Sequence, residues 1–182
     1  GDDPAGAGRA HLFEHLFKNS AHLGGRAHYE ILKAVGARGN ASTGADVTRY
    51  YTVVPPAALE TVLWLESDRM GYFLPGLDDV RVARQREVVR AERRQRYEAV
   101  AYGAVRFATA AALYPEGHPL RHGTIGEHDG IAATTRDDIE RWYRTWYVPA
   151  NAVLVIAGPV DVDATRALVD RWFGSFPAST ST

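Results

Sequence analysis

The chain has 182 residues, of which 46% are hydrophobic and 24% charged, and this composition predicts one soluble globular domain with an ordinary core. Its formal net charge of −1 excludes a basic surface for nucleic acid, and its lack of cysteine excludes disulfides and thiolate metal ligands. No apolar run approaches the roughly 20 residues of a membrane span, so we expect no membrane span.

The chain divides into a short lead-in, one domain and a short tail. Residues 1–8 are rich in Gly, Ala and Asp and predict a mobile lead-in, residues 9–177 form the domain, and residues 178–182 begin an interdomain linker. In chain order we expect helices at 10–19 and 27–35, strands at 40–43 and 47–54, helices at 56–72, 78–100, 101–113 and 135–147, a fully apolar strand at 152–157 and a helix at 161–173. Strands in ones and twos between helices predict an α+β fold.

The first predicted helix carries the most specific pattern of the chain. His11, Glu14 and His15 occupy positions i, i+3 and i+4, which share one face of an α-helix. Two imidazoles on one face can bind one metal ion, and a carboxylate beside them can take a proton from a bound water. This is the H-x-x-E-H arrangement, the reverse of H-E-x-x-H, which is a signature of zinc hydrolases.

The alternative for this trio is a solvated helix face that binds no metal. Four apolar residues are interleaved with the trio: Leu12, Phe13, Leu16 and Phe17. A helix that is apolar nearly all round is normally buried. Unpaired polar groups in a core cost on the order of 2–7 kcal/mol, and one metal ion would satisfy all three polar side chains. The pattern therefore favours a metal site.

A third ligand is expected, because a catalytic zinc usually has three protein ligands and a water. The long charged helix in the middle of the chain offers Glu92, which lies three and four residues beyond Val89 and Val88 and shares their predicted inward face. The alternative is an ion pair between Glu92 and an arginine such as Arg93 or Arg96. Spacing alone leaves the two possibilities open.

Seven stretches, in order along the chain, resemble the pitrilysin/insulinase-type zinc metallopeptidases, an inverted-zincin family that includes bacterial members and mitochondrial processing peptidase. The stretches are residues 8–15, 39–43, 46–50, 66–70, 86–94, 114–119 and 146–152. The resemblance covers residues 8–177. It implies the N-terminal catalytic domain of such a peptidase, with an antiparallel sheet, helices packed on one face, and a first strand that would precede residue 1.

The resemblance also implies roles for individual residues. In the family, zinc is held by the two motif histidines and by a glutamate about 75–77 residues after the second one. Glu92 lies 77 residues after His15, so the implied ligands are His11, His15 and Glu92, with Glu14 as general base. Many members carry another glutamate seven residues before the ligand glutamate. Gln85 stands there in this chain, and its lack of charge is expected to affect rate and not metal binding.

A substrate-binding role is expected for the predicted strand at 40–43. It is short, polar and flanked by glycine, which suits an exposed sheet edge to which an extended peptide could add through backbone hydrogen bonds. In the family the corresponding strand binds substrate beside the zinc, which points to Asn40, Ala41 and Ser42. The alternative is a plain edge strand capped by Asn40.

Together these residues predict a zinc-dependent endopeptidase domain that hydrolyses extended peptides through a metal-activated water and Glu14. The alternative is a zinc-binding but inactive fragment or non-catalytic subunit, because family active sites form between two homologous domains. Mn²⁺ or Co²⁺ could also occupy such a site. The expected partners are a peptide substrate and a second homologous domain or subunit, with no nucleic acid. The bacterial members imply cytoplasm or periplasm, and the sequence leaves the compartment open.

Overall fold

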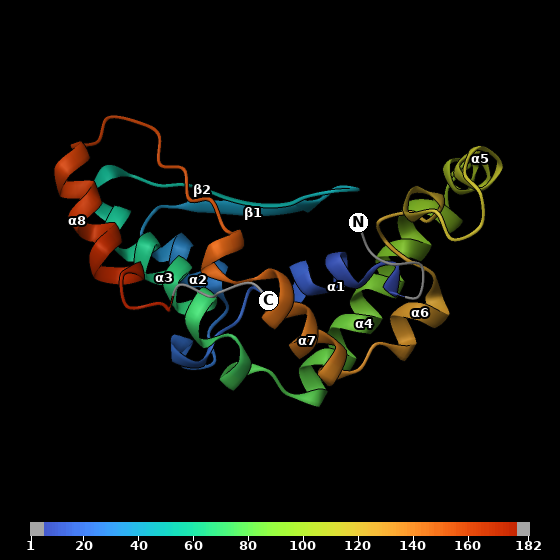
Figure 1. Cartoon of the computed structure of the whole chain (residues 1–182), viewed down its shortest axis with the longest axis horizontal. Coiled ribbons are helices and arrows are strands. Elements are labelled where there is room, and N and C mark those ends of the chain that lie inside the picture. Colours follow the sequence, from blue (N-terminus) through green and yellow to red (C-terminus); the bar gives the residue numbers. More distant parts are fainter. Residues whose placement is uncertain (1–5, 178–182) are drawn as a thin grey trace. The chain divides into compact units, whose positions relative to one another are not determined.

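The computed structural model describes residues 6–177 of the chain (Figure 1). The expected linker at 178–182 and most of the expected lead-in lie outside the described residues. The fold is α+β, as predicted, with a two-stranded antiparallel sheet among helices. Every helix within residues 6–177 is too short or too polar to cross a membrane.

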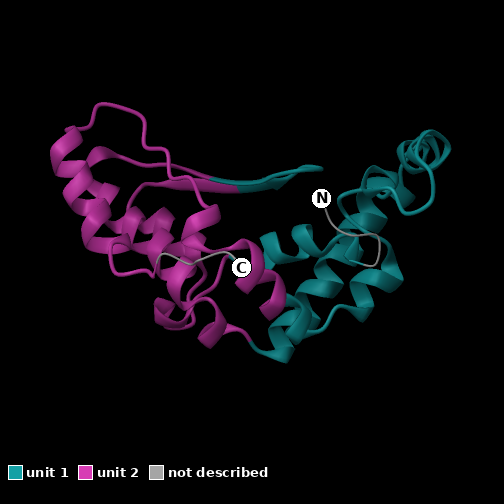
Figure 2. Cartoon of the chain, in the orientation of Figure 1, with its two compact units in different colours: residues 1–17, 41–50, 78–139 teal, residues 18–40, 51–77, 140–182 magenta. Residues whose placement is uncertain are grey.

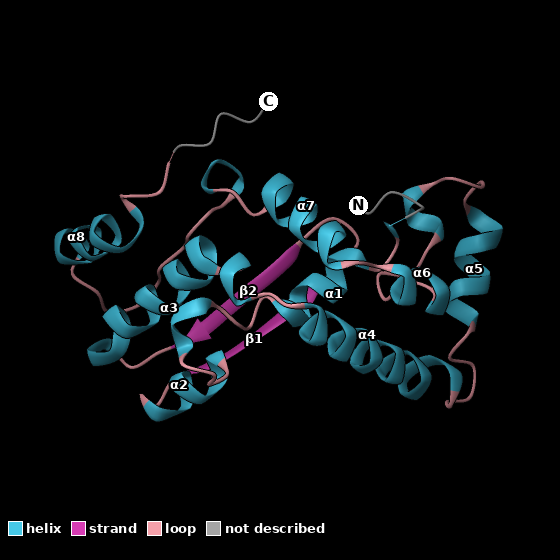
Figure 3. Ribbon diagram, turned by 90° about the horizontal axis from the view of Figure 1, so that it is seen from below, coloured by secondary structure: helices cyan, strands magenta, loops and turns pink. Residues whose placement is uncertain are grey.

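The helices and strands are distributed along the whole described chain (Figure 3). They are α1 (Arg9–Leu16), α2 (His28–Ala34), β1 (Arg38–Thr43), β2 (Thr48–Val53), α3 (Leu59–Tyr72), α4 (Asp79–Arg93), α5 (Val105–Leu113), α6 (His128–Ala133), α7 (Arg136–Trp146) and α8 (Val162–Phe173). Two compact units can be distinguished (Figure 2). Unit 1 comprises residues 1–17, 41–50 and 78–139, and unit 2 comprises residues 18–40, 51–77 and 140–182.

Unit 1 is built around the contact between α1 and α4, and α4 also packs on α6. α1 is buried as its all-round apolar sequence predicts, since Leu12, Phe13 and Leu16 have no exposed surface. α4 begins at the N-cap residue Asp78, whose carboxylate accepts a hydrogen bond of 2.6 Å from the backbone N–H of Arg81. This N-cap determines where α4 begins.

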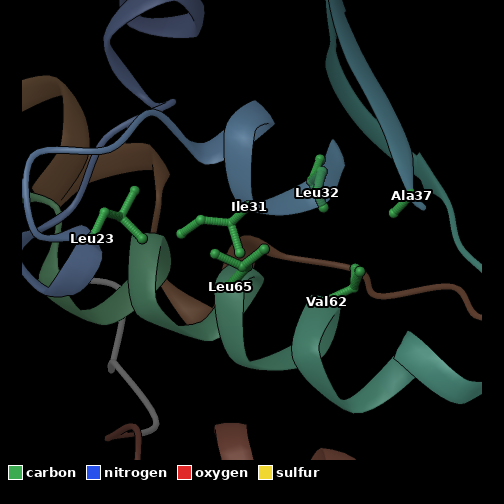
Figure 4. Packing of buried hydrophobic residues seen from close by; sticks show 6 residues of the cluster. All are labelled: Leu23, Ile31, Leu32, Ala37, Val62 and Leu65. Atoms are coloured by element: carbon green, nitrogen blue, oxygen red, sulfur yellow. The ribbon is translucent and has the colours of Figure 1, made fainter. Parts of the chain in front are cut away.

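Unit 2 has a core of aliphatic side chains (Figure 4). Its buried members are Leu23, Ile31, Leu32, Ala37, Val62 and Leu65. Val54, which follows β2, packs against this cluster, while Ala37 immediately precedes β1. The core thus joins α2 and α3 to one end of the hairpin, and α3 also contacts α8.

The hairpin of β1 and β2 confirms the two strands predicted at 40–43 and 47–54. The turn closes with a hydrogen bond of 2.8 Å from the backbone N–H of Gly44 to the carbonyl oxygen of Val47. Along β2 the side chains alternate between half-buried and exposed, which is the period of two expected for a strand with one covered face.

Three sequence expectations differ from the structure. Residues 152–157 do not form a strand, and Val153 and Val155 are 90% and 79% exposed; an apolar run becomes a strand only where a neighbour pairs with it, and the described residues provide none. The helix expected to reach residue 100 ends at Arg93 and continues as a π-helical turn, Arg94–Glu98. The helix expected to begin at residue 101 begins at Val105.

Candidate metal centre

α1 places the three residues of the motif on one face, as their spacing predicts. The rings of His11 and His15 meet edge to face, with their centroids 4.8 Å apart. Glu14 is buried, with only 6% of its surface exposed. The helix begins after Gly8, whose φ of 92° lies in the left-handed region, and the backbone N–H of Leu12 donates to the Gly8 carbonyl oxygen at 2.9 Å.

Glu92 reaches the two histidines from α4. Its Oε2 atom lies 3.8 Å from His11 Nε2 and 3.3 Å from His15 Nε2. The three ligand atoms lie within 4.8 Å of one another, and among residues 6–177 this is the one group of three or more His, Cys, Asp or Glu side chains so arranged. Two ligand atoms about 2.0–2.1 Å from a tetrahedral zinc would be about 3.3 Å apart, so the group fits such an ion after small side-chain adjustments.

Glu92 also forms the ion pair that its sequence context had left as the alternative. Arg96 Nη1 lies 3.0 Å from Glu92 Oε1. Arg93 turns elsewhere and donates to Glu98 and Glu127. One oxygen of the carboxylate therefore faces the histidines and the other faces Arg96. A metal ligand and an ion-pair partner are thus compatible roles for Glu92.

The helix face predicted for Glu92 is narrower than the sequence suggested. Val89 is fully buried, but Val88 is 41% exposed, so the expectation that both valines point inward is wrong for Val88. Successive residues of a helix are rotated by 100°, so Val88 and Val89 face different directions. Only one stripe of the α4 surface is covered, by α1 and α6. Gln85, two turns before Glu92, is half-buried on the same side of α4.

Glu14 has a partner that the sequence did not reveal. The hydroxyl of Thr43, the last residue of β1, donates a hydrogen bond of 2.6 Å to Glu14 Oε2. The Thr43 hydroxyl also lies 3.2 Å from the hydroxyl of Thr48, the first residue of β2. Thr43 belongs to the stretch that carried the family resemblance, but spacing alone gives no sign that it meets Glu14.

The three residues expected to bind substrate precede Thr43 on β1. Asn40 and Ser42 are exposed, and Ala41 is half-buried on the same face as Thr43, because strand residues alternate between faces. β1 pairs with β2 and with no other strand among the described residues. The substrate role of Asn40, Ala41 and Ser42 stays a prediction.

A comparison with family models identifies the group to which this arrangement belongs. The model described as Insulinase (Peptidase family M16) matches residues 1–121, which include the whole cluster of His11, His15 and Glu92. The chain belongs to this family. A second model, described as Peptidase M16 inactive domain, matches residues 133–182.

Curated relatives of this family member are bacterial and mitochondrial. The chain is 33% identical over 172 residues to the zinc protease PqqE of Helicobacter pylori, which covers 93% of the chain and 38% of the relative. It is 26% identical over 178 residues to the probable mitochondrial-processing peptidase subunit beta of Arabidopsis thaliana, which covers 96% of the chain and 33% of the relative. The chain thus spans between 33% and 38% of the length of these relatives.

Solved structures share the fold over the entire chain. A protease from Helicobacter pylori superposes with a TM-score of 0.88 at 30% identity, covering 100% of this chain and 44% of that one. Pitrilysin gives a TM-score of 0.80 at 24% identity, covering 100% of this chain and 20% of that one. The first half of the periplasmic protease PqqL from Escherichia coli gives 0.82 at 22% identity, with 100% and 40% covered. At these lower identities the likeness shows the fold alone.

Proposed function

We propose that this chain is the zinc-binding, catalytic part of a metalloendopeptidase, with His11, His15 and Glu92 as the metal ligands. The observation that carries the proposal is the convergence of these three ligand atoms within 4.8 Å, beside the buried carboxylate of Glu14. Two imidazoles and one carboxylate form a donor set typical of catalytic zinc. The names of the curated relatives, several of which are zinc proteases, support zinc as the metal.

The chemistry assigned to the chain's own residues centres on Glu14. Zinc bound here would supply Lewis-acid chemistry, which acidifies water and polarises a carbonyl. The Glu14 carboxylate takes the proton of the attacking water and passes it to the leaving amine, as a general base and then a general acid. Arg96 holds the Glu92 oxygen that faces away from the histidines, which keeps the other oxygen directed toward them.

The substrate is proposed to be a peptide in an extended conformation. β1 is an edge strand of a two-stranded sheet, and Asn40, Ala41 and Ser42 lead directly to the residue that contacts Glu14. A peptide added to this edge would be held by backbone hydrogen bonds, so that its sequence would matter less than its extension.

A second homologous domain is proposed to complete the active site. The chain spans 38% of the length of the zinc protease PqqE, and one structural neighbour is the first half of a protease. Such a chain can bind zinc and yet cleave slowly without this second domain or an equivalent subunit. A chain that bound zinc and cleaved nothing even with that partner present would be a non-catalytic zinc-binding subunit.

The test combines metal analysis with peptide cleavage. The chain should retain about one zinc after dialysis, and it should cleave an unstructured fluorogenic peptide, faster when the second homologous domain or subunit is present. Glu14→Gln should keep the zinc and lower the rate by about 10²–10⁴-fold, the usual contribution of a general base. A zinc-loaded Glu14→Gln protein that cleaved as fast as the wild type would overturn the role of Glu14.

A further inference from the structure

We propose that Thr43 is a positioning residue that orients the Glu14 carboxylate and links the β1 edge strand to the site of proton transfer. The proposal rests on the proposed function of Glu14 as general base. It assigns a role to a side chain that holds no metal and that the motif does not contain.

The contact between Thr43 and Glu14 has the geometry of a strong hydrogen bond. The distance from Thr43 Oγ1 to Glu14 Oε2 is 2.6 Å, within the 2.5–2.7 Å typical of a hydroxyl that donates to a carboxylate. Glu14 is buried, so water competes little for this oxygen. Because a carboxylate can only accept, the single hydroxyl proton of Thr43 is committed to Glu14.

A second hydroxyl, that of Thr48, extends this contact into a chain of hydrogen bonds. Its hydroxyl lies 3.2 Å from the Thr43 hydroxyl, across the start of the hairpin turn. Since the proton of Thr43 is already used, Thr48 is the donor and Thr43 the acceptor in this second contact. The three side chains therefore form a chain of hydrogen bonds that runs from Thr48 through Thr43 to Glu14.

This contact makes the two oxygens of Glu14 unequal. Oε2 already accepts a hydrogen bond from Thr43, and we assign the proton of the attacking water to Oε1. The threonine side chain is branched at Cβ and therefore stiff at χ1, which fixes the hydroxyl relative to the strand. Catalysis by a general base depends on such placement, because a displacement of about 1 Å can lower a rate by about 10²-fold.

The same contact sets the register between the strand and the base. Ala41 and Thr43 share one face of β1, while Asn40 and Ser42 lie on the other. A peptide aligned by the backbone of this strand would be placed relative to a residue that is itself hydrogen-bonded to Glu14. Thr43 would therefore affect turnover more than peptide affinity.

The first arm of the test measures the contact itself, in the metal-free chain and without substrate. Thr43→Val removes the hydroxyl and keeps the shape, and Glu14→Ala removes the acceptor. Urea unfolding of the two single variants and the double variant should show that Thr43→Val raises the unfolding equilibrium constant about tenfold when Glu14 is present, and less than about threefold when it is replaced. An equal effect in both backgrounds would overturn the proposal.

The second arm measures the consequence for turnover in the complete protein. Thr43→Val should lower kcat by about 10²-fold with KM and zinc content unchanged, and Thr43→Ser, which restores the hydroxyl, should recover most of the rate. Thr52→Val, on the same strand pair, is the matched control and should leave kcat unchanged. A rise in KM alone would contradict the positioning role. A wild type without turnover would contradict the peptidase proposal, while the first arm would still decide whether Thr43 orients Glu14.

Discussion

Arg93 donates a hydrogen bond of 2.5 Å from Nη1 to the backbone carbonyl oxygen of Gly126, and so ties α4 to the loop that meets the start of α1. Gly126 and Gly8 approach so closely that a Cβ atom on Gly126 would lie 2.4 Å from the carbonyl oxygen of Ala7. One residue beyond Glu92, α4 is thus held against the backbone from which the histidine-bearing helix begins. This contact therefore helps to hold α1 and α4, the two helices that carry the candidate ligands, against each other.

Replacement of Arg93 should weaken both the fold and the metal centre. The buried guanidinium of Arg93 also pairs with Glu98 and Glu127 and lies 4.7 Å from the ring centroid of Phe107. The side chains of Glu98 and Glu127 are 42% and 56% exposed, so we expect Arg93→Ala to cost about 2 kcal/mol in the free energy of unfolding, less than the loss of a fully buried pair. Urea unfolding measures this cost.

Arg93→Lys separates charge from geometry. A lysine keeps the charge but cannot donate to three acceptors in the fixed fork of a guanidinium, so about half of the stability loss should remain. Zinc affinity, measured by competition with a chelator, should fall in both variants. Unchanged stability and affinity in Arg93→Ala would contradict the bracing role.

The close approach at Gly126 predicts a large cost for a single methyl group. Gly126 has a φ of 76° and Gly117 has a φ of 81°, but only Gly126 has atoms within 4 Å of an added Cβ. Gly117→Ala should therefore cost about 1 kcal/mol from backbone strain alone. Gly126→Ala should cost about 3 kcal/mol, because the clash adds to the same strain. Thermal unfolding of the two variants tests the difference. Equal costs would show that the loop around Gly126 can shift to accommodate the methyl group, and would contradict the predicted clash.

The sequence was sufficient for part of this centre because some of its contacts are local. His11, Glu14 and His15 lie within one and a half helical turns, so helical periodicity alone places them together. Glu92 lies 77 residues after His15, and only the family spacing favoured a ligand over a residue of an ion pair. The structure places its carboxylate 3.3 Å from His15 and 3.0 Å from Arg96, so its role as a ligand stays a proposal. Thr43 was not predicted, since its contact with Glu14 depends on how the hairpin meets α1.

The strand expected at 152–157 was wrong for a related reason. Its unbroken apolar sequence was read as a buried strand, but burial requires a neighbour that the sequence of the run itself does not specify. The hairpin was predicted correctly because its two strands are joined by a short turn and satisfy each other. Local pairing could be read from the chain, and distant pairing could not.

A buried histidine in unit 2 predicts how stability depends on pH. Burial, together with the positive charge of Arg69, lowers the pKa of His28 from 6.5 to about 3. Glu66 Oε1 is 3.7 Å from His28 Nε2, beyond hydrogen-bonding distance, and the Glu66 carboxylate already accepts a hydrogen bond of 2.7 Å from Arg69 Nε. The folded state therefore keeps His28 neutral where an unfolded chain would protonate it.

The sign follows from the proton count. Between pH 6.5 and about 3 the unfolded state binds a proton at His28 that the folded state does not. The contribution of His28 to the free energy of unfolding is therefore fully present above pH 6.5 and is lost as the pH falls. The slope from this group approaches about 1.4 kcal/mol per pH unit. His28→Phe, which cannot titrate, should unfold in urea with a correspondingly weaker pH dependence over this range. Parallel curves for the two proteins would show that His28 is protonated in the folded state.

Zinc should stabilise the chain only when all three ligands are present. A ligand that binds the folded state alone at 100 times its Kd adds about 2.7 kcal/mol, which corresponds to roughly 5–10 °C in Tm for a protein of this size. Chelation should reverse the shift. Glu14→Gln should retain it because Glu14 is not a proposed ligand, whereas His15→Ala should abolish it because two remaining ligands hold zinc weakly. His122→Ala, outside the cluster, is the matched histidine control; a loss of the shift in His122→Ala, or its persistence in His15→Ala, would place the zinc elsewhere.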